Sequence, residues 1–238
     1  MSEQGERHLF AINHAATALL VKKRFPDQPI VWLLLSVQLM ELLWVLLNLL
    51  GVERTTTDAS IQSVANIHLS YMPYSHSVAS ALGLSLLAWL LCRFVLKRPG
   101  LGLPVAIGIT SHFVLDLVTH APDLPLAPGI DAPKLGLGLY AALPISAFVL
   151  ELAYGFWCWW VYRGGKALLT VIILFNVANL SFLSPAVPGP ESLLAHRPTL
   201  IVCVILLQIV VTLFLVGWFS LRPLPPYVGS SHQSQHAA

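Results

Sequence analysis

The sequence predicts an all-α membrane protein, a bundle of about six transmembrane helices preceded by a short N-terminal helix. Of its 238 residues, 56% are hydrophobic and only 10% are charged, whereas a soluble domain carries about 25% charged residues. Several apolar runs approach the ~20 residues that a helix needs to cross a bilayer. Only helices and closed barrels satisfy their backbone groups in lipid, and the period-two alternation of a barrel is not visible. A soluble globular domain is therefore excluded.

Six apolar segments predict the spanning helices, at residues 30–50, 77–96, 101–120, 139–162, 166–183 and 199–221. The run before them, residues 8–21, has only 14 residues. It is too short to span comfortably, so we expect an interfacial or half-inserted helix there. The chain then divides into a cytoplasmic or interfacial N-terminal segment (1–29), a transmembrane helical domain (30–222) and a disordered tail (223–238).

Basic residues are distributed unevenly between the two ends of these helices. With six crossings, ten Lys and Arg residues fall on one side and three, Arg54, Lys134 and Arg197, on the other. The positive-inside rule then predicts that both termini are cytoplasmic. The net charge of +2 is spread along the chain, so the basic stripe of a nucleic-acid binder is missing. Membrane lipids are the expected partners, and the oligomeric state stays open.

Ionisable side chains inside membrane helices are costly, so the few that occur indicate function. His112, Asp116 and His120 follow one another at steps of four in the third spanning segment. Four residues rotate a helix by about 400°, so these side chains lie on one helix face. Imidazole and carboxylate groups are ligands of zinc and similar ions, and His76 is a natural ligand from a second element. Glu41, in the middle of the first spanning segment, is expected to ligate the ion or to orient a histidine.

The alternative for these side chains is a structural polar cluster that specifies helix packing. Their spacing favours a metal or catalytic site over that alternative. For Glu151, in the fourth spanning segment, a structural role and membership of the site are equally open. His14 lies in the short N-terminal run, where packing at the membrane interface is expected.

Three stretches carry a resemblance to a known family: Met72-Pro73-Tyr74-Ser75-His76-Ser77, Ser111-His112-x3-Asp116-x3-His120-x-Pro122-Asp123-x-Pro125, and Pro133-Lys134-x-Gly136-Leu137-Gly138-Leu139. They resemble a group of bacterial integral membrane proteins that are similar to the predicted membrane-bound metal-dependent hydrolases. The likeness extends from Asn13-His14 to Glu151. It implies a location in the bacterial inner membrane and a divalent metal, with zinc expected, held by His14, Glu41, His76, His112 and Asp116.

Metal-assisted hydrolysis of a lipid or lipid-linked ester or phosphoester, at the outer side of the membrane, is the function that these residues favour. Asp123, His120 and Glu53 are the expected catalytic residues, with Glu41 as an alternative base. Lys134, near two glycines in the loop 121–138, is expected to hold an anionic head group or else to be a solvated loop charge.

Two other functions use the same side chains. A transporter or a proton- or ion-coupled membrane protein would line a pathway with the His and acidic residues. Such a pathway should be polar on both sides of the membrane, whereas the ionisable groups crowd the outer half. A membrane scaffold would use the polar cluster only to fix packing.

Overall fold

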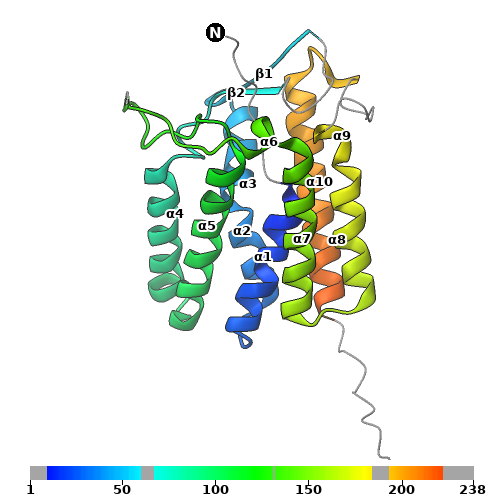
Figure 1. The fold of residues 1–238 in the computed structure, drawn as a ribbon. Helices are drawn as coiled ribbons and strands as arrows, with labels where there is room; N and C mark the ends of the chain where they lie inside the picture. The colour runs from blue at the N-terminus through cyan, green and yellow to red at the C-terminus, as the bar shows by residue number, and fades with distance from the viewer. Residues whose placement is uncertain (1–9, 60–66, 131, 184–192, 222–238) are drawn as a thin grey trace, which may run out of the picture.

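The structure, a computed structural model, describes residues 10–59, 67–130, 132–183 and 193–221. These residues form one bundle of helices with a small hairpin at one end (Figure 1). The elements in chain order are α1 (Ala11–Arg24), α2 (Ile30–Val37), α3 (Leu39–Leu49), β1 (Arg54–Thr57), β2 (Ile67–Tyr71), α4 (Val78–Leu90), η2 (Leu91–Val95), α5 (Pro99–Thr119), α6 (Leu139–Ala142), α7 (Pro144–Tyr162), α8 (Lys166–Ala178), α9 (Leu180–Leu183) and α10 (Pro198–Ser220). The bundle agrees with the predicted all-α class, and the antiparallel β1–β2 hairpin is an addition to it.

Four helices are long and apolar enough to cross a membrane by themselves: α4 with its π-helical extension η2, α5, α7 and α10. The pair α2 and α3 makes a fifth only if the 54° bend between them belongs to one broken span. The predicted span 166–183 is divided into the 13-residue α8 and the four-residue α9. The described residues are therefore compatible with an integral membrane protein of four or five such spans, and the count of six is not confirmed.

Helix α1 packs inside the bundle. Nine of its 14 residues are buried, and it packs against α7, α2, α10 and α5. Small side chains let membrane helices approach one another closely. At Gly155 of α7, an added Cβ would lie only 2.7 Å from Oδ1 of Asn13. The expected interfacial position of His14 is thus corrected, because neighbouring helices, and not the headgroup region, surround this short helix.

The break between α2 and α3 lies at Gln38, whose backbone leaves the helical conformation. The Gln38 side-chain amide donates a hydrogen bond to the carbonyl of Ala11 (2.8 Å) and so joins the break to α1. Helix α5 passes close by, since a Cβ at Gly108 would lie 2.0 Å from Oγ of Ser36. Broken membrane helices offer backbone carbonyls to polar groups in the protein interior. The break therefore brings such carbonyls to the face of α5 that carries His112.

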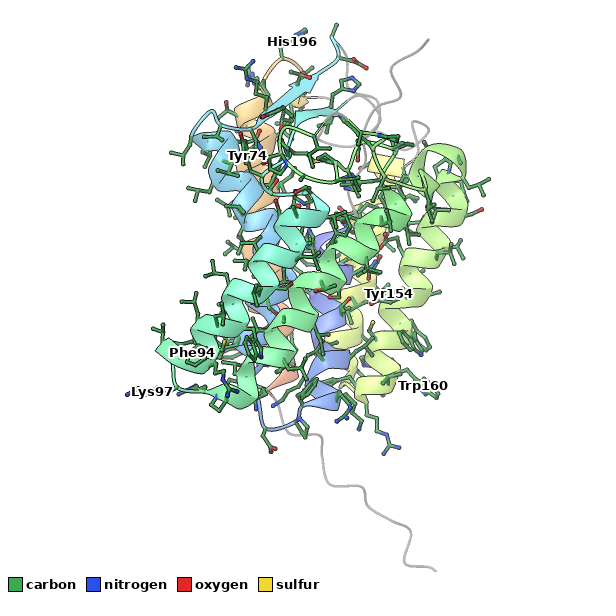
Figure 2. The ribbon with its side chains drawn as sticks, turned by 90° about the vertical axis from the view of Figure 1, so that its left-hand side faces the viewer. Tyr74, Phe94, Lys97, Tyr154, Trp160 and His196 are labelled. Atoms are coloured by element: carbon green, nitrogen blue, oxygen red, sulfur yellow. The ribbon has the colours of Figure 1, made fainter. Side chains whose placement is uncertain are left out.

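The two ends of the bundle differ in composition. Tyr74 and His196 lie at one end, and Lys97 and Trp160 lie at the other (Figure 2). We name them the hairpin end, which carries β1, β2 and the loop between α5 and α6, and the basic end, which carries the C-terminus of α1 and the η2–α5 and α7–α8 turns (Figure 1). The basic end carries eight of the ten basic residues predicted to be cytoplasmic: Lys22, Lys23, Arg24, Arg93, Lys97, Arg98, Arg163 and Lys166. The other two, and both predicted cytoplasmic termini, lie outside the described residues.

Candidate metal centre

The five residues predicted to bind a metal meet in the interior of the bundle. His14 comes from α1, Glu41 from α3, His76 from the turn before α4, and His112 and Asp116 from α5. Each of the five is at most 6% exposed. The ring centroids of His14 and His112 lie 3.9 Å apart, and those of His76 and His112 lie 5.5 Å apart. We name these five residues the His/acid cluster.

The donor atoms of the cluster lie at similar distances from one another. Nε2 of His112 lies 3.1 Å from Oδ2 of Asp116 and 3.8 Å from Oε2 of Glu41. Nε2 of His76 lies 3.4 Å from Nε2 of His112, 3.3 Å from Oε2 of Glu41 and 3.6 Å from Oδ2 of Asp116. Nε2 of His14 lies 3.3 Å from Oδ1 of Asp116. Ligand atoms ~2.1 Å from a tetrahedral ion are about 3.4 Å from one another. These donor atoms form two groups of three that could each hold a metal ion, His14–His112–Asp116 and Glu41–His76–His112, and the two groups share His112.

The outward-facing nitrogens of two rings have partners that determine where the protons lie. Nδ1 of His112 lies 2.7 Å from the carbonyl oxygen of Val37, which can only accept, so Nδ1 carries the hydrogen. The Ser75 hydroxyl donates its single hydrogen to Glu53 (2.6 Å), and therefore accepts from Nδ1 of His76 at 2.8 Å. In the neutral form of both rings, Nε2 then presents a lone pair to the centre of the cluster.

Lone pairs and carboxylate oxygens therefore face one another in a region without solvent. The two oxygens of Asp116 lie 3.1 to 3.6 Å from imidazole nitrogens of His14, His76 and His112. A buried charge without a compensating partner is costly. A positive charge at the centre, either a metal ion or added protons, relieves this cost. Nitrogen and oxygen donors of this kind could hold a metal ion.

Glu53 occupies a different place from that expected of a catalytic base. One carboxylate oxygen accepts hydrogen bonds from the backbone N–H groups of Tyr74 and Ser75, both at 2.9 Å. The other accepts from the Ser75 hydroxyl, behind His76. Its carboxylate thus holds the turn that carries His76.

His120 and Asp123 form a pair beside the cluster. Nδ1 of His120 lies 3.0 and 3.3 Å from the two carboxylate oxygens of Asp123, and the His120 ring centroid lies 6.3 Å from that of His76. The end of the loop closes on this pair at Gly136, which has φ +142° and where a Cβ would lie 2.0 Å from the carbonyl oxygen of Ala121. Lys134, on the same loop, is exposed at the surface of the hairpin end.

A second buried polar network adjoins the cluster, and the sequence indicated only one of its members, Glu151. Tyr140 and Asn13 both donate hydrogen bonds to the Glu151 carboxylate, and Asn13 also donates to Oδ1 of Asn176 (2.9 Å). Asn13 directly precedes His14 in α1, so the helix joins the two groups. Asn13 and Asn176, which lie within apolar runs, were the signal in the sequence that could have indicated this network, because a buried amide in a membrane bundle needs a partner.

No family model, no curated protein and no solved structure matches this chain. Function is therefore inferred from the geometry of the His/acid cluster.

Proposed function

We propose that this chain is a metal-dependent hydrolase embedded in the membrane, which cleaves a lipid or a lipid-linked ester or phosphoester. The observation that carries the proposal is the convergence of lone pairs and carboxylates in the His/acid cluster. Zinc is the proposed ion, and His14, Glu41, His76, His112 and Asp116 are its proposed ligands. When bound, such an ion polarises the scissile group and lowers the pKa of a coordinated water toward ~7.

The His120–Asp123 pair is the proposed acid–base group. The Asp123 carboxylate accepts the hydrogen of Nδ1, which leaves Nε2 of His120 as the basic nitrogen. The His120 ring lies beside that of His76, with 6.3 Å between the two ring centroids. Asp123 thus orients His120, while Glu53 and Ser75 orient His76.

The surroundings of the cluster support a lipid-like substrate that approaches from the hairpin end. The loop between α5 and α6 carries Leu126, Ile130 and Leu137, which are 40%, 54% and 73% exposed. Apolar side chains exposed above spanning helices are suited to contact acyl chains. His120 and Asp123 lie at the base of this loop, so a substrate bound along it would bring its polar part to the acid–base pair.

A proton-coupled transporter is the second candidate, and the Glu151 network favours it. That network lies next to the cluster through Asn13 and His14, so buried polar groups extend from α5 across α1 to α7 and α8. Buried carboxylates and histidines in membrane helices commonly carry protons. In this alternative, the positive charge at the centre of the His/acid cluster is carried by a proton and not by a metal ion.

Metal analysis of the detergent-purified protein tests the proposal. We expect about one zinc per chain in the wild type and a loss of bound metal in His112→Ala, because one of the converging nitrogens is removed. His68→Ala is the matched control, since His68 also contacts an aspartate, Asp58 (2.8 Å), but belongs to the β1–β2 hairpin. Folded wild-type protein that binds no metal and hydrolyses no phospholipid or lipid phosphate in a panel would contradict the proposed hydrolase function.

A further inference from the structure

A cavity of about 450 Å³ opens at the basic end, between the C-terminus of α1 and the α7–α8 turn. Its lining includes three cations, Lys22, Lys23 and Arg163. Within the part of the chain that the structure describes, the residues lining this cavity include no acidic side chain. Tyr162 and Phe219 add aromatic walls. The cavity therefore has the charge and the mixed lining of a site for an anion that carries apolar groups.

A neighbouring cavity of about 470 Å³ shares two of these cations, Lys23 and Arg163. It is also lined by Trp159 and Trp160. Trp160 is 64% exposed and lies at the same end of the molecule as Lys97 (Figure 2). Tryptophans at the ends of spanning helices lie at the level of the lipid head groups. The two shared cations, Lys23 and Arg163, therefore lie beside exposed tryptophans at the basic end.

The backbone around the cations is held in place by hydrogen bonds. Arg163 ends α7 in the left-handed conformation, with φ 60°, and the N–H of Gly164 donates to the carbonyl of Trp159 (3.1 Å). The Trp159 indole returns a hydrogen bond to the carbonyl of Gly165 (3.0 Å). At the end of α1, the Lys22 ammonium donates to the carbonyl of Gln28 (2.8 Å). A site whose backbone is already ordered loses less entropy on binding.

We propose that these two cavities bind the phosphate head group of an anionic glycerophospholipid, with Lys23 and Arg163 as the phosphate-binding cations. Arginine binds phosphate oxygens through paired N–H groups, and lysine adds a compact positive charge. The acyl chains lie along the lipid-facing surface of α7, where Phe156 and Trp157 are 48% and 47% exposed. Basic residues that only determine the orientation in the membrane act as surface charges, whereas a bound lipid head group requires a pocket. This site is independent of the His/acid cluster, at the opposite end of α1.

Native mass spectrometry of the purified full chain tests the site, with phosphatidylglycerol, phosphatidylcholine and inorganic phosphate as separate probes. We expect phosphatidylglycerol to bind in preference to phosphatidylcholine, and inorganic phosphate not to displace it. Lys23→Gln and Arg163→Asn should each weaken phosphatidylglycerol binding about fivefold, as expected for the loss of one cation near a lipid phosphate. Asparagine is chosen at position 163 because it tolerates a positive φ.

Lys97→Asn is the matched control, because Lys97 is exposed at the same end with φ 54° but lines neither cavity. Its affinity for phosphatidylglycerol should equal that of the wild type. An equal loss in Lys97→Asn would overturn the proposal in favour of a general surface potential. Unchanged affinity in Lys23→Gln, whose exposed side chain can be replaced without disturbing the fold, would overturn it directly. Binding of inorganic phosphate as strong as that of the lipid would overturn the lipid as the ligand.

Discussion

In His76 and His112, the two nitrogens of the ring have separate tasks. In His112 one nitrogen donates to the Val37 carbonyl and the other faces Asp116. In His76 the relay through Ser75 to Glu53 performs the same task as that carbonyl. Partners of this kind select the tautomer, orient the ring and raise its basicity as a ligand. The orientation of these two rings is therefore fixed by the Val37 carbonyl and by Ser75 and Glu53.

Replacing Glu53 by Gln tests this relay. An amide cannot accept at both positions as a carboxylate does, so His76 should lose its fixed tautomer and orientation. We expect zinc affinity to fall about 10- to 100-fold, the usual effect of removing a partner of a metal-binding histidine. Asp58→Asn, which alters the His68 partner in the hairpin, should leave the affinity unchanged. Equal affinities in Glu53→Gln and wild type, measured by competition with a chelator, would refute the relay.

Asp116→Asn separates the hydrolase from the transporter. The amide is a neutral and poorer donor, so bound zinc and hydrolysis should decrease together, while the helical circular dichroism stays as in the wild type. A transporter that uses Asp116 as a proton carrier would instead lose pH-dependent flux, and neither form would contain stoichiometric metal. Metal content, hydrolysis and flux measured on the same preparations decide between the two.

At the scale of elements, the loop between α5 and α6 holds the His120–Asp123 pair through its own backbone. Leu124 and Leu135 exchange backbone hydrogen bonds of 3.0 and 2.8 Å, and Leu137 donates to the carbonyl of Leu117 (2.9 Å). The loop carbonyls of Pro125 and Leu126 accept from the first N–H groups of α4, which would otherwise lack partners. The loop is thus a packed part of the bundle, and its geometry determines where His120 lies.

Gly136→Ala should open this loop. The added Cβ would overlap the carbonyl of Ala121, and φ +142° is unfavourable for any other residue. We expect a loss of about 1–3 kcal/mol of stability from backbone strain alone, with reduced hydrolysis. Gly129→Ala is the control in the same loop, because Gly129 has φ +74° but nothing lies within 4 Å of its added Cβ. A melting temperature for Gly136→Ala as high as that for Gly129→Ala would contradict the role assigned to the close approach.

For the whole molecule, the uneven distribution of charge predicts the orientation in the membrane. The basic end should face the cytoplasm and the hairpin end the outside. Single cysteines at Ile130 and at Lys97, in a variant without Cys92, Cys158 and Cys203, should report this. We expect an impermeant maleimide to label position 130, but not position 97, in intact cells. Labelling of position 97 alone would reverse the orientation and with it the proposed outer site.

Helical periodicity was sufficient to place His112 and Asp116 on one face of α5, and composition was sufficient to predict helices apolar enough to cross a membrane. Periodicity could not reveal that His120 ends this helix and pairs with Asp123, because the end of a helix depends on what its last turn contacts. The length of the N-terminal apolar run, residues 8–21, could not show that α1 is buried inside the bundle. Length measures whether a helix can cross a bilayer, whereas burial depends on neighbours that are distant in the sequence.

The chemical types of the residues in the His/acid cluster follow directly from the sequence, since only a few ionisable residues interrupt its apolar runs. Which of them converge was decided by the tertiary structure. The 54° break at Gln38 joins α2 and α3 to α1 and α5, and the Val37 carbonyl next to it selects the tautomer of His112. Hydrogen bonds of this kind join residues 75 positions apart, so local patterns contain no information about them. The site exists because packing brings together groups that are each costly to bury alone.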